Sequence, residues 1–167
     1  MSLIDPKTLP YRPCVGIMLL NTEGLIWIGR RSDGLVSHEY QQPWQMPQGG
    51  IDKGEDPKVA AIRELHEETG VTSASIIAES KRWIQYDLPP ETVGKAMKGK
   101  FRGQEQKWFA MRFTGDEREI NLNPEGHKPE FDAWRWAPAS EVLDEIVGFK
   151  RDAYRAVIEE FRPLLVA

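Results

Sequence analysis

The sequence has little of several features that mark secreted and membrane proteins. It contains one cysteine, Cys14, in 167 residues, so no intrachain disulfide can form and a disulfide-held secreted scaffold is excluded. No apolar stretch approaches the roughly 20 residues of a membrane-spanning helix, and the N-terminus lacks the basic start and apolar run of a signal peptide. Repeats and low-complexity tracts are also absent. These absences predict a cytoplasmic, soluble protein with a single domain over residues 1–167.

The chain also lacks an excess of positive charge. It has 22 Lys and Arg against 26 Asp and Glu, a formal net charge of −4. This balance excludes a globally basic nucleic-acid coat protein, although it leaves room for a local basic patch. Hydrophobic residues make up 40% and charged residues 29%, which is typical of a globular chain long enough to bury a substantial core.

Short apolar runs predict strands. Two of them, residues 14–20 and 25–28, flank a turn cluster that ends at Gly24 and predict a β-hairpin. Further strands are expected over residues 76–78, 82–88, 107–113 and 133–136. Helices are expected over residues 56–70, over residues 140–147 with Ser140 as the cap, and after Gly148. Because strands and helices do not alternate, the order favours an α+β arrangement with a mixed sheet.

The helix over residues 56–70 has the clearest signals. Asp56 is a good N-cap, Pro57 occupies the first helical position, and Gly70 follows the last turn. An apolar face is expected from residues at helical spacing, which are Val59, Ile62 and Leu65 with Ala60, Ala61 and Thr69 beside them.

Three glutamates on this helix point to metal chemistry. Successive helical residues turn by about 100°, so Glu67 and Glu68 lie one turn beyond Glu64 and all three carboxylates face one sector. Like charges at these spacings destabilise an isolated helix, as does their position near its C-terminus. A hard divalent cation such as Mg²⁺ would offset both effects, since it prefers oxygen ligands. The alternative for an isolated pattern of this kind is a solvated acidic face.

The surrounding residues favour the metal interpretation. Residues 49–71, GGIDKGEDPKVAAIRELHEETGV, fill every fixed position of the Nudix box, and the sequence therefore resembles the Nudix hydrolase family. The resemblance implies the Nudix fold, a mixed β-sheet sandwiched between helices (α/β/α), and hydrolysis of a nucleoside diphosphate linked to another group. It implies metal binding and water activation by Glu64, Glu67 and Glu68, and structural support of the box by Gly49, Glu55, Arg63 and Gly70. In that support, Arg63 braces the loop by pairing with Glu55.

The resemblance extends beyond the box to the bacterial RNA pyrophosphohydrolase and dinucleoside polyphosphate hydrolase subfamily. It is carried by segments such as QMPQGG at residues 45–50, QKWF at 106–109, PEFD at 129–132 and FKRD at 149–152. It implies that Glu130 is a further metal ligand. It also implies a set of substrate-binding residues, with Arg31 and Phe149 at the nucleobase and Arg12, Tyr86 and Lys150 near the phosphates.

Other residues have simpler interpretations. Taken alone, Glu130 would be a surface acid and Phe149 a core residue. We expect Cys14 and the tryptophans at positions 44, 108, 134 and 136 to lie in the core, and we expect no chemistry from His38, His66 or His127. The basic residues Lys95, Lys98, Lys100 and Arg102 predict a solvated loop, with contact to RNA as the second interpretation.

Together these residues predict a Mg²⁺-dependent hydrolase of phosphoric anhydride bonds, for which Mn²⁺ or another divalent cation could substitute. The first candidate substrate is triphosphorylated RNA, which would lose pyrophosphate, keep a 5′-monophosphate and become open to decay. The alternative is a dinucleoside polyphosphate such as diadenosine tetraphosphate, a branch that the long loop at residues 32–43 also resembles. A catalytically silent nucleotide-binding domain is disfavoured, because every box carboxylate is present. No membrane and no obligate protein partner is evident in the sequence.

Overall fold

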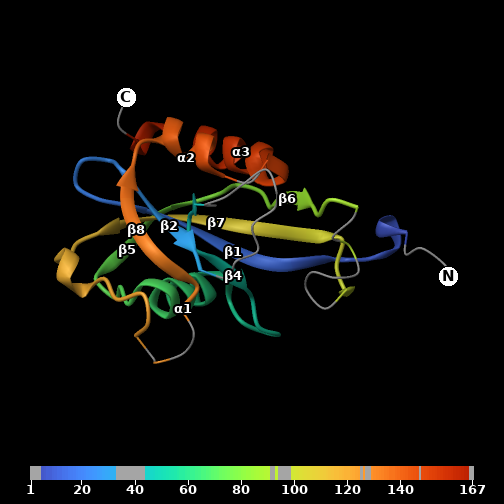
Figure 1. The fold of residues 1–167 in the computed structure, drawn as a ribbon, viewed down its shortest axis with the longest axis horizontal. Coiled ribbons are helices and arrows are strands. Elements are labelled where there is room, and N and C mark those ends of the chain that lie inside the picture. Colours follow the sequence, from blue (N-terminus) through green and yellow to red (C-terminus); the bar gives the residue numbers. More distant parts are fainter. Residues whose placement is uncertain are drawn as a thin grey trace.

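Two long parallel strands form the centre of the fold (Figure 1). The structure, a computed structural model, describes residues 5–32, 44–90, 93, 99–124, 126, 129–146 and 148–165. The central strands are β1 (Tyr11–Leu20) and β7 (Gly103–Phe113), and they pair in unbroken register from Tyr11↔Gly103 to Leu20↔Arg112. The strand expected over residues 107–113 therefore starts four residues earlier.

Shorter strands flank this pair, and each is antiparallel to its neighbour. On one side, β4 (Gln48–Gly50) follows the first half of β1, and β2 (Ile26–Arg31) meets its end and pairs with β3 (Trp44–Gln45) and β8 (Phe131–Ala137). On the other side, β6 (Ile84–Asp87) and β5 (Ala74–Glu79) share the length of β7. The described strands thus form the mixed sheet that the sequence predicts.

The expected hairpin between β1 and β2 forms, but it is short. The Asn21 side chain accepts hydrogen bonds from the backbone N–H groups of Glu23 and Leu25, and Gly24 adopts a φ of 76°. Only Leu20↔Ile26 is in register across the two strands. Beyond that point β2 pairs with β8 instead, because β4 takes the adjoining edge of β1.

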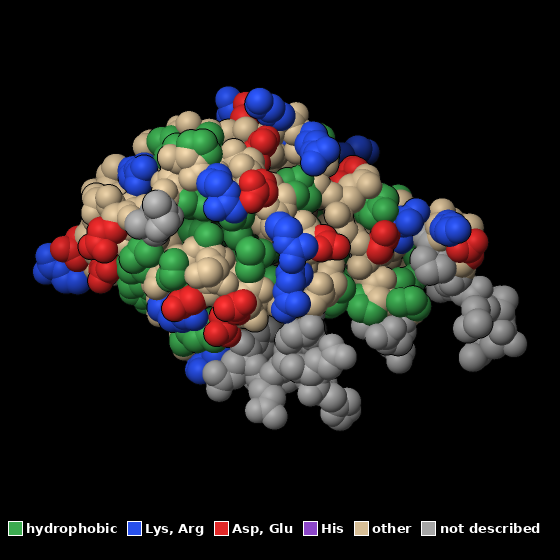
Figure 2. Space-filling model, turned by 90° about the horizontal axis from the view of Figure 1, so that it is seen from above, with side chains coloured by type: hydrophobic (Ala, Val, Ile, Leu, Met, Phe, Trp, Pro, Cys, Tyr) green, Lys and Arg blue, Asp and Glu red, His purple; other side chains and the backbone are tan. Residues whose placement is uncertain are grey.

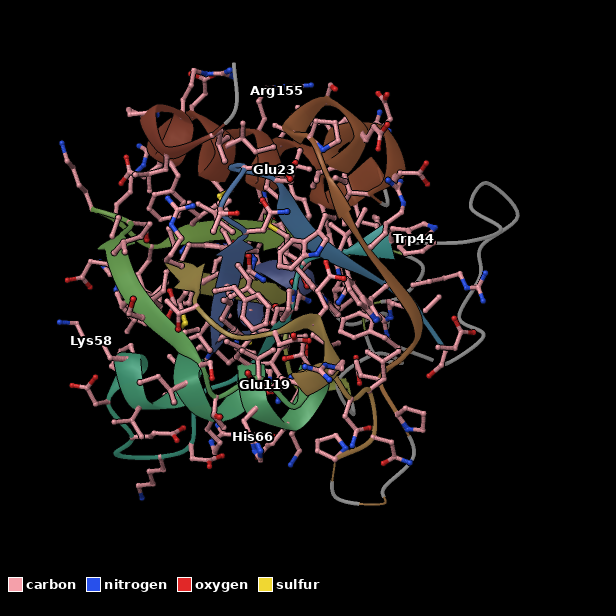
Figure 3. The ribbon with its side chains drawn as sticks, turned by 90° about the vertical axis from the view of Figure 1, so that its left-hand side faces the viewer. Glu23, Trp44, Lys58, His66, Glu119 and Arg155 are labelled. Atoms are coloured by element: carbon pink, nitrogen blue, oxygen red, sulfur yellow. The ribbon has the colours of Figure 1, made fainter. Side chains whose placement is uncertain are left out.

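Helices cover both faces of the sheet (Figure 3). Helix α1 (Pro57–Thr69) lies on one face, and α2 (Ala139–Glu145) and α3 (Arg151–Phe161) lie on the other. Short 3-10 turns complete the helical segments: η1 (Pro6–Thr8), η3 (Glu117–Glu119), η4 (Gly148–Lys150) and η5 (Arg162–Leu164). This arrangement confirms the α/β/α sandwich. None of the described helices is both long and apolar enough to cross a membrane.

Alternation along β1 divides the core in two. Val15, Ile17 and Leu19 pack toward α1, whereas Met18 and Leu20 pack toward α2 and α3. The tryptophans expected in the core differ in outcome: Trp108 is fully buried, but Trp44, Trp134 and Trp136 are only partly buried at its margins. Trp27, which the sequence analysis did not single out, is fully buried and stacks on Trp134.

Helix α1 has the predicted ends and part of the predicted face, since Leu65, Ala60, Ala61 and Thr69 are buried as expected. The Asp56 side chain accepts from the Lys58 N–H, and Gly70, at φ 76°, donates its N–H to the His66 carbonyl. Val59 and Ile62 are each 55% exposed, so their assignment to the buried face was wrong. Small side chains such as Ala61 meet the sheet instead, because the helix lies close to it.

Helix α2 begins differently from the prediction. Pro138 is its N-cap residue, with no side-chain hydrogen bond, and Ser140 lies inside the first turn. The capping role expected for Ser140 was therefore wrong. Pro138 favours the start of the helix without a side-chain hydrogen bond, because its fixed φ is close to the helical value. Helix α3 buries the residues expected on its apolar face: Ala153, Tyr154, Val157, Ile158 and Phe161.

The cap of α1 yields a test of local stability. Replacing Asp56 with Ala leaves the Lys58 N–H without its acceptor, and we expect the free energy of unfolding to fall by about 1 kcal/mol. Asp56→Asn is the matched control and should retain most of that stability. Urea denaturation measures both variants, and equal stabilities for Asp56→Ala and the wild type would contradict the capping role.

Candidate active site

Strand β4 passes close to the charged ends of two side chains, one on each of its faces. A Cβ added to Gly49 would lie 2.1 Å from the carboxyl carbon of Glu64, and one added to Gly50 would lie 2.4 Å from a guanidinium nitrogen of Arg12. The two glycines face opposite sides of the sheet, because they pair with Val15 and Cys14 in turn. The thin strand thus separates an acidic side chain from a basic one.

Arg63 ties the loop, the strand and the helix together. Its guanidinium donates to both carboxylate oxygens of Glu55 at 2.8 and 2.9 Å and to the Gly50 carbonyl at 3.0 Å. It also donates to Glu64 at 3.0 Å and to Glu67 at 3.2 Å. The bond from Arg63 lowers the pKa of Glu55 to about 2. The pairing of Arg63 with Glu55 agrees with what the resemblance implies.

The box glutamates differ in exposure. The Glu67 side chain is 44% exposed, that of Glu64 is 13% exposed, and Glu68 is buried. Burial raises the pKa of Glu64 to about 7, although the charge of Arg63 opposes the rise. Burial also raises the pKa of Glu68 well above its usual range, and the charges of Glu64 and Glu130 add to the effect. Glu68 accepts one bond, from the Gln48 backbone N–H at 3.3 Å.

These four carboxylates, Glu64, Glu67, Glu68 and Glu130, form what we call the carboxylate cluster. Glu130 is exposed at the bend before β8, yet its charge reaches Glu68. Among the described residues, no three His, Cys, Asp or Glu side chains already stand close enough together to hold a metal ion. The chemistry of the cluster nonetheless fits a hard divalent cation, because several oxygen donors repel one another around a buried carboxylate.

A second group, the Tyr86 cluster, gathers all five residues that the resemblance assigns to substrate: Arg12, Arg31, Tyr86, Phe149 and Lys150. The Tyr86 and Phe149 rings lie 5.8 Å apart between centroids, and the Lys150 ammonium lies 5.6 Å from the Tyr86 ring. Burial raises the pKa of Tyr86, while the positive charges of Arg31 and Arg12 oppose the rise. Three cations therefore act on the buried Tyr86 side chain, Lys150 against its ring and Arg12 and Arg31 through their charge.

Two members of this cluster have a burial that is unusual for their residue type. Lys150 is buried, 4% exposed, and donates to the Gln45 side chain at 3.3 Å. Phe149 is 37% exposed, so it is not a core residue and part of its side chain is accessible beside Tyr86. Positive charge and an accessible aromatic ring side by side can hold the phosphates and the base of a nucleotide.

The sequence analysis gave no role to the residues that join the two clusters. Gln48 donates its backbone N–H to Glu68, and its side chain hydrogen-bonds both Gln106 and Tyr86. Gln106 is 1% exposed. Little in the sequence pointed to Gln106, because it lies in the polar run Gln-Glu-Gln-Lys over residues 104–107 at the start of β7.

The remaining expectations have mixed outcomes. Cys14 is buried, and burial raises the pKa of its thiol to about 12, as suits an inert core residue. His66 lies on the side of α1 away from the sheet (Figure 3).

Arg102 pairs with Asp87 at 2.9 Å and lies over the Tyr11 ring, so it is not a free loop cation. Lys95, Lys98, His38, His127 and most of the loop at residues 32–43 lie outside the described residues.

Known proteins resemble this chain in sequence and in fold. The sequence matches the NUDIX domain over residues 10–157. It is 58% identical to the RNA pyrophosphohydrolase of Brucella ovis and 57% identical to that of Brucella abortus strain 2308, over 98% of this chain and 94% of each relative.

Solved structures share the fold at low sequence identity. The MutT protein from Methanosarcina mazei has a TM-score of 0.63 and 20% identity, over 91% of this chain and 96% of that one. The Ap4A hydrolase from C. elegans has a TM-score of 0.61 and 18% identity, over 91% of this chain and 98% of that one.

The raised pKa values predict how stability depends on pH and on divalent cations. A folded-state pKa raised from 4.5 to about 7 at Glu64 adds stability below the unfolded value, and this stability is lost as pH rises through 7. Glu68 shifts in the same direction. We therefore expect the cation-free protein to melt at a lower temperature at about pH 8 than at about pH 5.

Added MgCl₂ should raise the melting temperature more at the higher pH, where the carboxylates are ionised. Glu68→Gln should flatten both dependences. The groups with lowered pKa, such as Glu55 and Glu119, titrate below this interval and do not disturb it. A melting temperature that depends neither on pH nor on the Mg²⁺ concentration would contradict the assignment of the carboxylate cluster as a cation site.

Proposed function

The chain belongs to the NUDIX domain family, and from this premise we propose that it removes pyrophosphate from the 5′-triphosphate end of RNA. The protein is a hydrolase of pyrophosphate bonds. Water adds to the phosphorus, pyrophosphate leaves, and the RNA keeps a 5′-monophosphate. RNA as the substrate is supported by the names of the curated relatives, which match almost the whole chain.

One observation carries the proposal: the carboxylate cluster and the Tyr86 cluster lie on either side of one strand segment. Gln48 touches both, through its backbone to Glu68 and through its side chain to Tyr86. A triphosphate end offers a polyphosphate chain next to a base, and it therefore matches an acidic site beside cations and an aromatic ring.

We assign the following work to the residues of the chain. Glu64, Glu67, Glu68 and Glu130 hold a divalent cation, Mg²⁺ in the first instance, and such a cation supplies positive charge against phosphate and lowers the pKa of water. Glu64 takes the proton from the attacking water. Arg63 and Glu55 keep the loop and helix in place. Arg12, Tyr86 and Lys150 contact phosphate oxygens, while Arg31 and Phe149 hold the first base.

Among the residues that the structure describes, those on the face above α2 and α3 form no broad basic field for RNA. Figure 2 shows Lys and Arg side chains interspersed with Asp and Glu over that face. Ion pairs such as Arg155 with Asp152 account for part of this mixture. RNA recognition is therefore assigned to the 5′ end itself, inside the Tyr86 cluster, rather than to a long track of phosphate contacts. Because transcripts lie in the cytoplasm, we place the enzyme there as part of the same proposal.

Turnover of two substrates tests the proposal. We expect pyrophosphate release from triphosphorylated RNA with Mg²⁺ present, at a higher kcat/KM than hydrolysis of diadenosine tetraphosphate. Glu67→Gln should lower the RNA rate by about 100-fold or more with the fold retained, because it removes a charge but keeps the size. His66→Gln, on the far side of the same helix, is the matched control and should remain active. Faster cleavage of diadenosine tetraphosphate would contradict the proposal and make that compound the preferred substrate.

The open ring of Phe149 gives a separate test of base binding. Phe149→Ala should raise KM for RNA by about tenfold or more, the worth of one lost base stack, with kcat little changed. Phe149→Trp keeps an aromatic surface and should keep KM near the wild-type value. The melting temperature of both variants should stay high because the ring is partly exposed. A normal KM with a large fall in melting temperature would return Phe149 to a packing role.

A further inference from the structure

A chain of buried side-chain hydrogen bonds runs from the core toward the site. The Trp108 Nε1–H donates to Gln106 Oε1 at 2.9 Å. The Gln106 Nε2 then donates to Gln48 Oε1 at 3.1 Å and to Gln104 Oε1 at 2.8 Å. Trp108 is fully buried and Gln106 is 1% exposed, so water does not compete for these groups.

The Trp108 indole fixes which group donates and which accepts in this series of hydrogen bonds. An indole N–H can only donate, whereas a glutamine amide can be turned either way. The Trp108 ring is locked in place, because it lies over Gly16, where a Cβ would be 2.4 Å away, and it packs edge-on against Tyr154 at 5.6 Å. Gln106 must therefore turn its oxygen to the indole and its nitrogen to Gln48.

The direction passes on to Tyr86. With its Oε1 facing Gln106, the Gln48 amide is left with its Nε2 to offer to the Tyr86 hydroxyl. Gln48 is the side chain that hydrogen-bonds the Tyr86 hydroxyl, so its remaining Nε2 is the donor and the phenolic oxygen is the acceptor. Since the oxygen accepts from Gln48, the hydroxyl proton is free to point into the Tyr86 cluster.

We propose that Trp108 and Gln106 are positioning residues which, acting through Gln48, orient the Tyr86 hydroxyl to donate its proton to a phosphate oxygen of the substrate. The inference rests on the proposed function, because phosphate oxygens are the acceptors that it needs. A hydroxyl turned inward would present only lone pairs to the phosphate and would repel it. Buried core residues thus determine whether the Tyr86 hydroxyl donates or accepts a hydrogen bond in the site.

Gln106→Glu reverses the chain with almost no change in volume. In its ionised form the new carboxyl group accepts from Trp108 but cannot donate to Gln48, and because burial favours the neutral acid, the kinetics are measured at about pH 9 as well as at neutral pH. The Gln48 amide then turns its nitrogen to residue 106 and its oxygen to Tyr86, and the hydroxyl donates inward. We expect KM for triphosphorylated RNA to rise by about tenfold, the value of one hydrogen bond to a charged group, with kcat little changed. A purely structural defect would instead lower the active fraction, and therefore kcat, at unchanged KM.

Gln104→Glu is the matched control for the added charge. It lies two residues away on β7 and keeps the oxygen that accepts from Gln106, so the direction of the chain is preserved. We expect its KM to rise much less than that of Gln106→Glu. In a Tyr86→Phe background the hydroxyl is gone, and Gln106→Glu should then cost no more than Gln104→Glu does. The Trp108 indole N–H signal in NMR spectra should persist in Gln106→Glu, since its acceptor remains.

The outcomes separate this inference from the proposed function. Wild-type turnover of RNA and of diadenosine tetraphosphate reports on the function, whereas the differences between variants report on the chain of bonds with whichever substrate is cleaved. Equal KM values for Gln106→Glu and Gln104→Glu, or an undiminished effect of Gln106→Glu in the Tyr86→Phe background, would overturn the inference. If Gln106→Glu does not fold, Gln48→Glu reverses the last bond alone and carries the same expectation.

Discussion

One guanidinium holds the site in its shape. Arg63 bonds the loop through Glu55, the strand through the Gly50 carbonyl, and the helix through Glu64 and Glu67. Its fork of donors allows these contacts at once, which a lysine could not do. Because it lies against carboxylates that repel one another, it also supplies positive charge where the helix dipole supplies none. The path of β4 past α1, and hence the position of Glu64 and Glu68, depends on this side chain.

Two consecutive glycines in β4 let an acidic side chain and a basic side chain approach the strand from opposite faces. Gly49 leaves room for the Glu64 carboxylate on one face of the sheet, and Gly50 leaves room for the Arg12 guanidinium on the other. Larger side chains at these two positions would displace the charged ends of both groups. Glu64, Glu67 and Glu68 lie on the α1 side because they belong to that helix, whereas Arg12, on β1, approaches Gly50 from the opposite face of the strand. Under the proposed function, the substrate would meet the cation held by the carboxylate cluster and the base-binding residues on either side of this strand segment.

Sequence reasoning succeeded where neighbours along the chain decide the structure. The ends of α1 follow from Asp56 and Gly70, because capping is satisfied within a few residues. It failed where a distant surface decides: Val59 and Ile62 have the right spacing for a buried face but lie outward, since the sheet meets the alanine side of the helix. Pro138 displaced Ser140 as the cap of α2 for a local reason, because β8 ends at Ala137 and the helix already begins at Ala139.

By itself, the sequence determined the box helix, its acidic sector, the pairing of Arg63 with Glu55 and the α+β class, all of which depend on residues close in the chain or on the pattern of the box. Only the tertiary structure decided that Lys150 is buried against Gln45, that Phe149 stands open beside Tyr86, and that Trp108 reaches the site through Gln106 and Gln48. These contacts join segments far apart in the sequence. Their geometry is set by the register of β1 against β7 and by the packing of α3, which no local pattern of residues specifies.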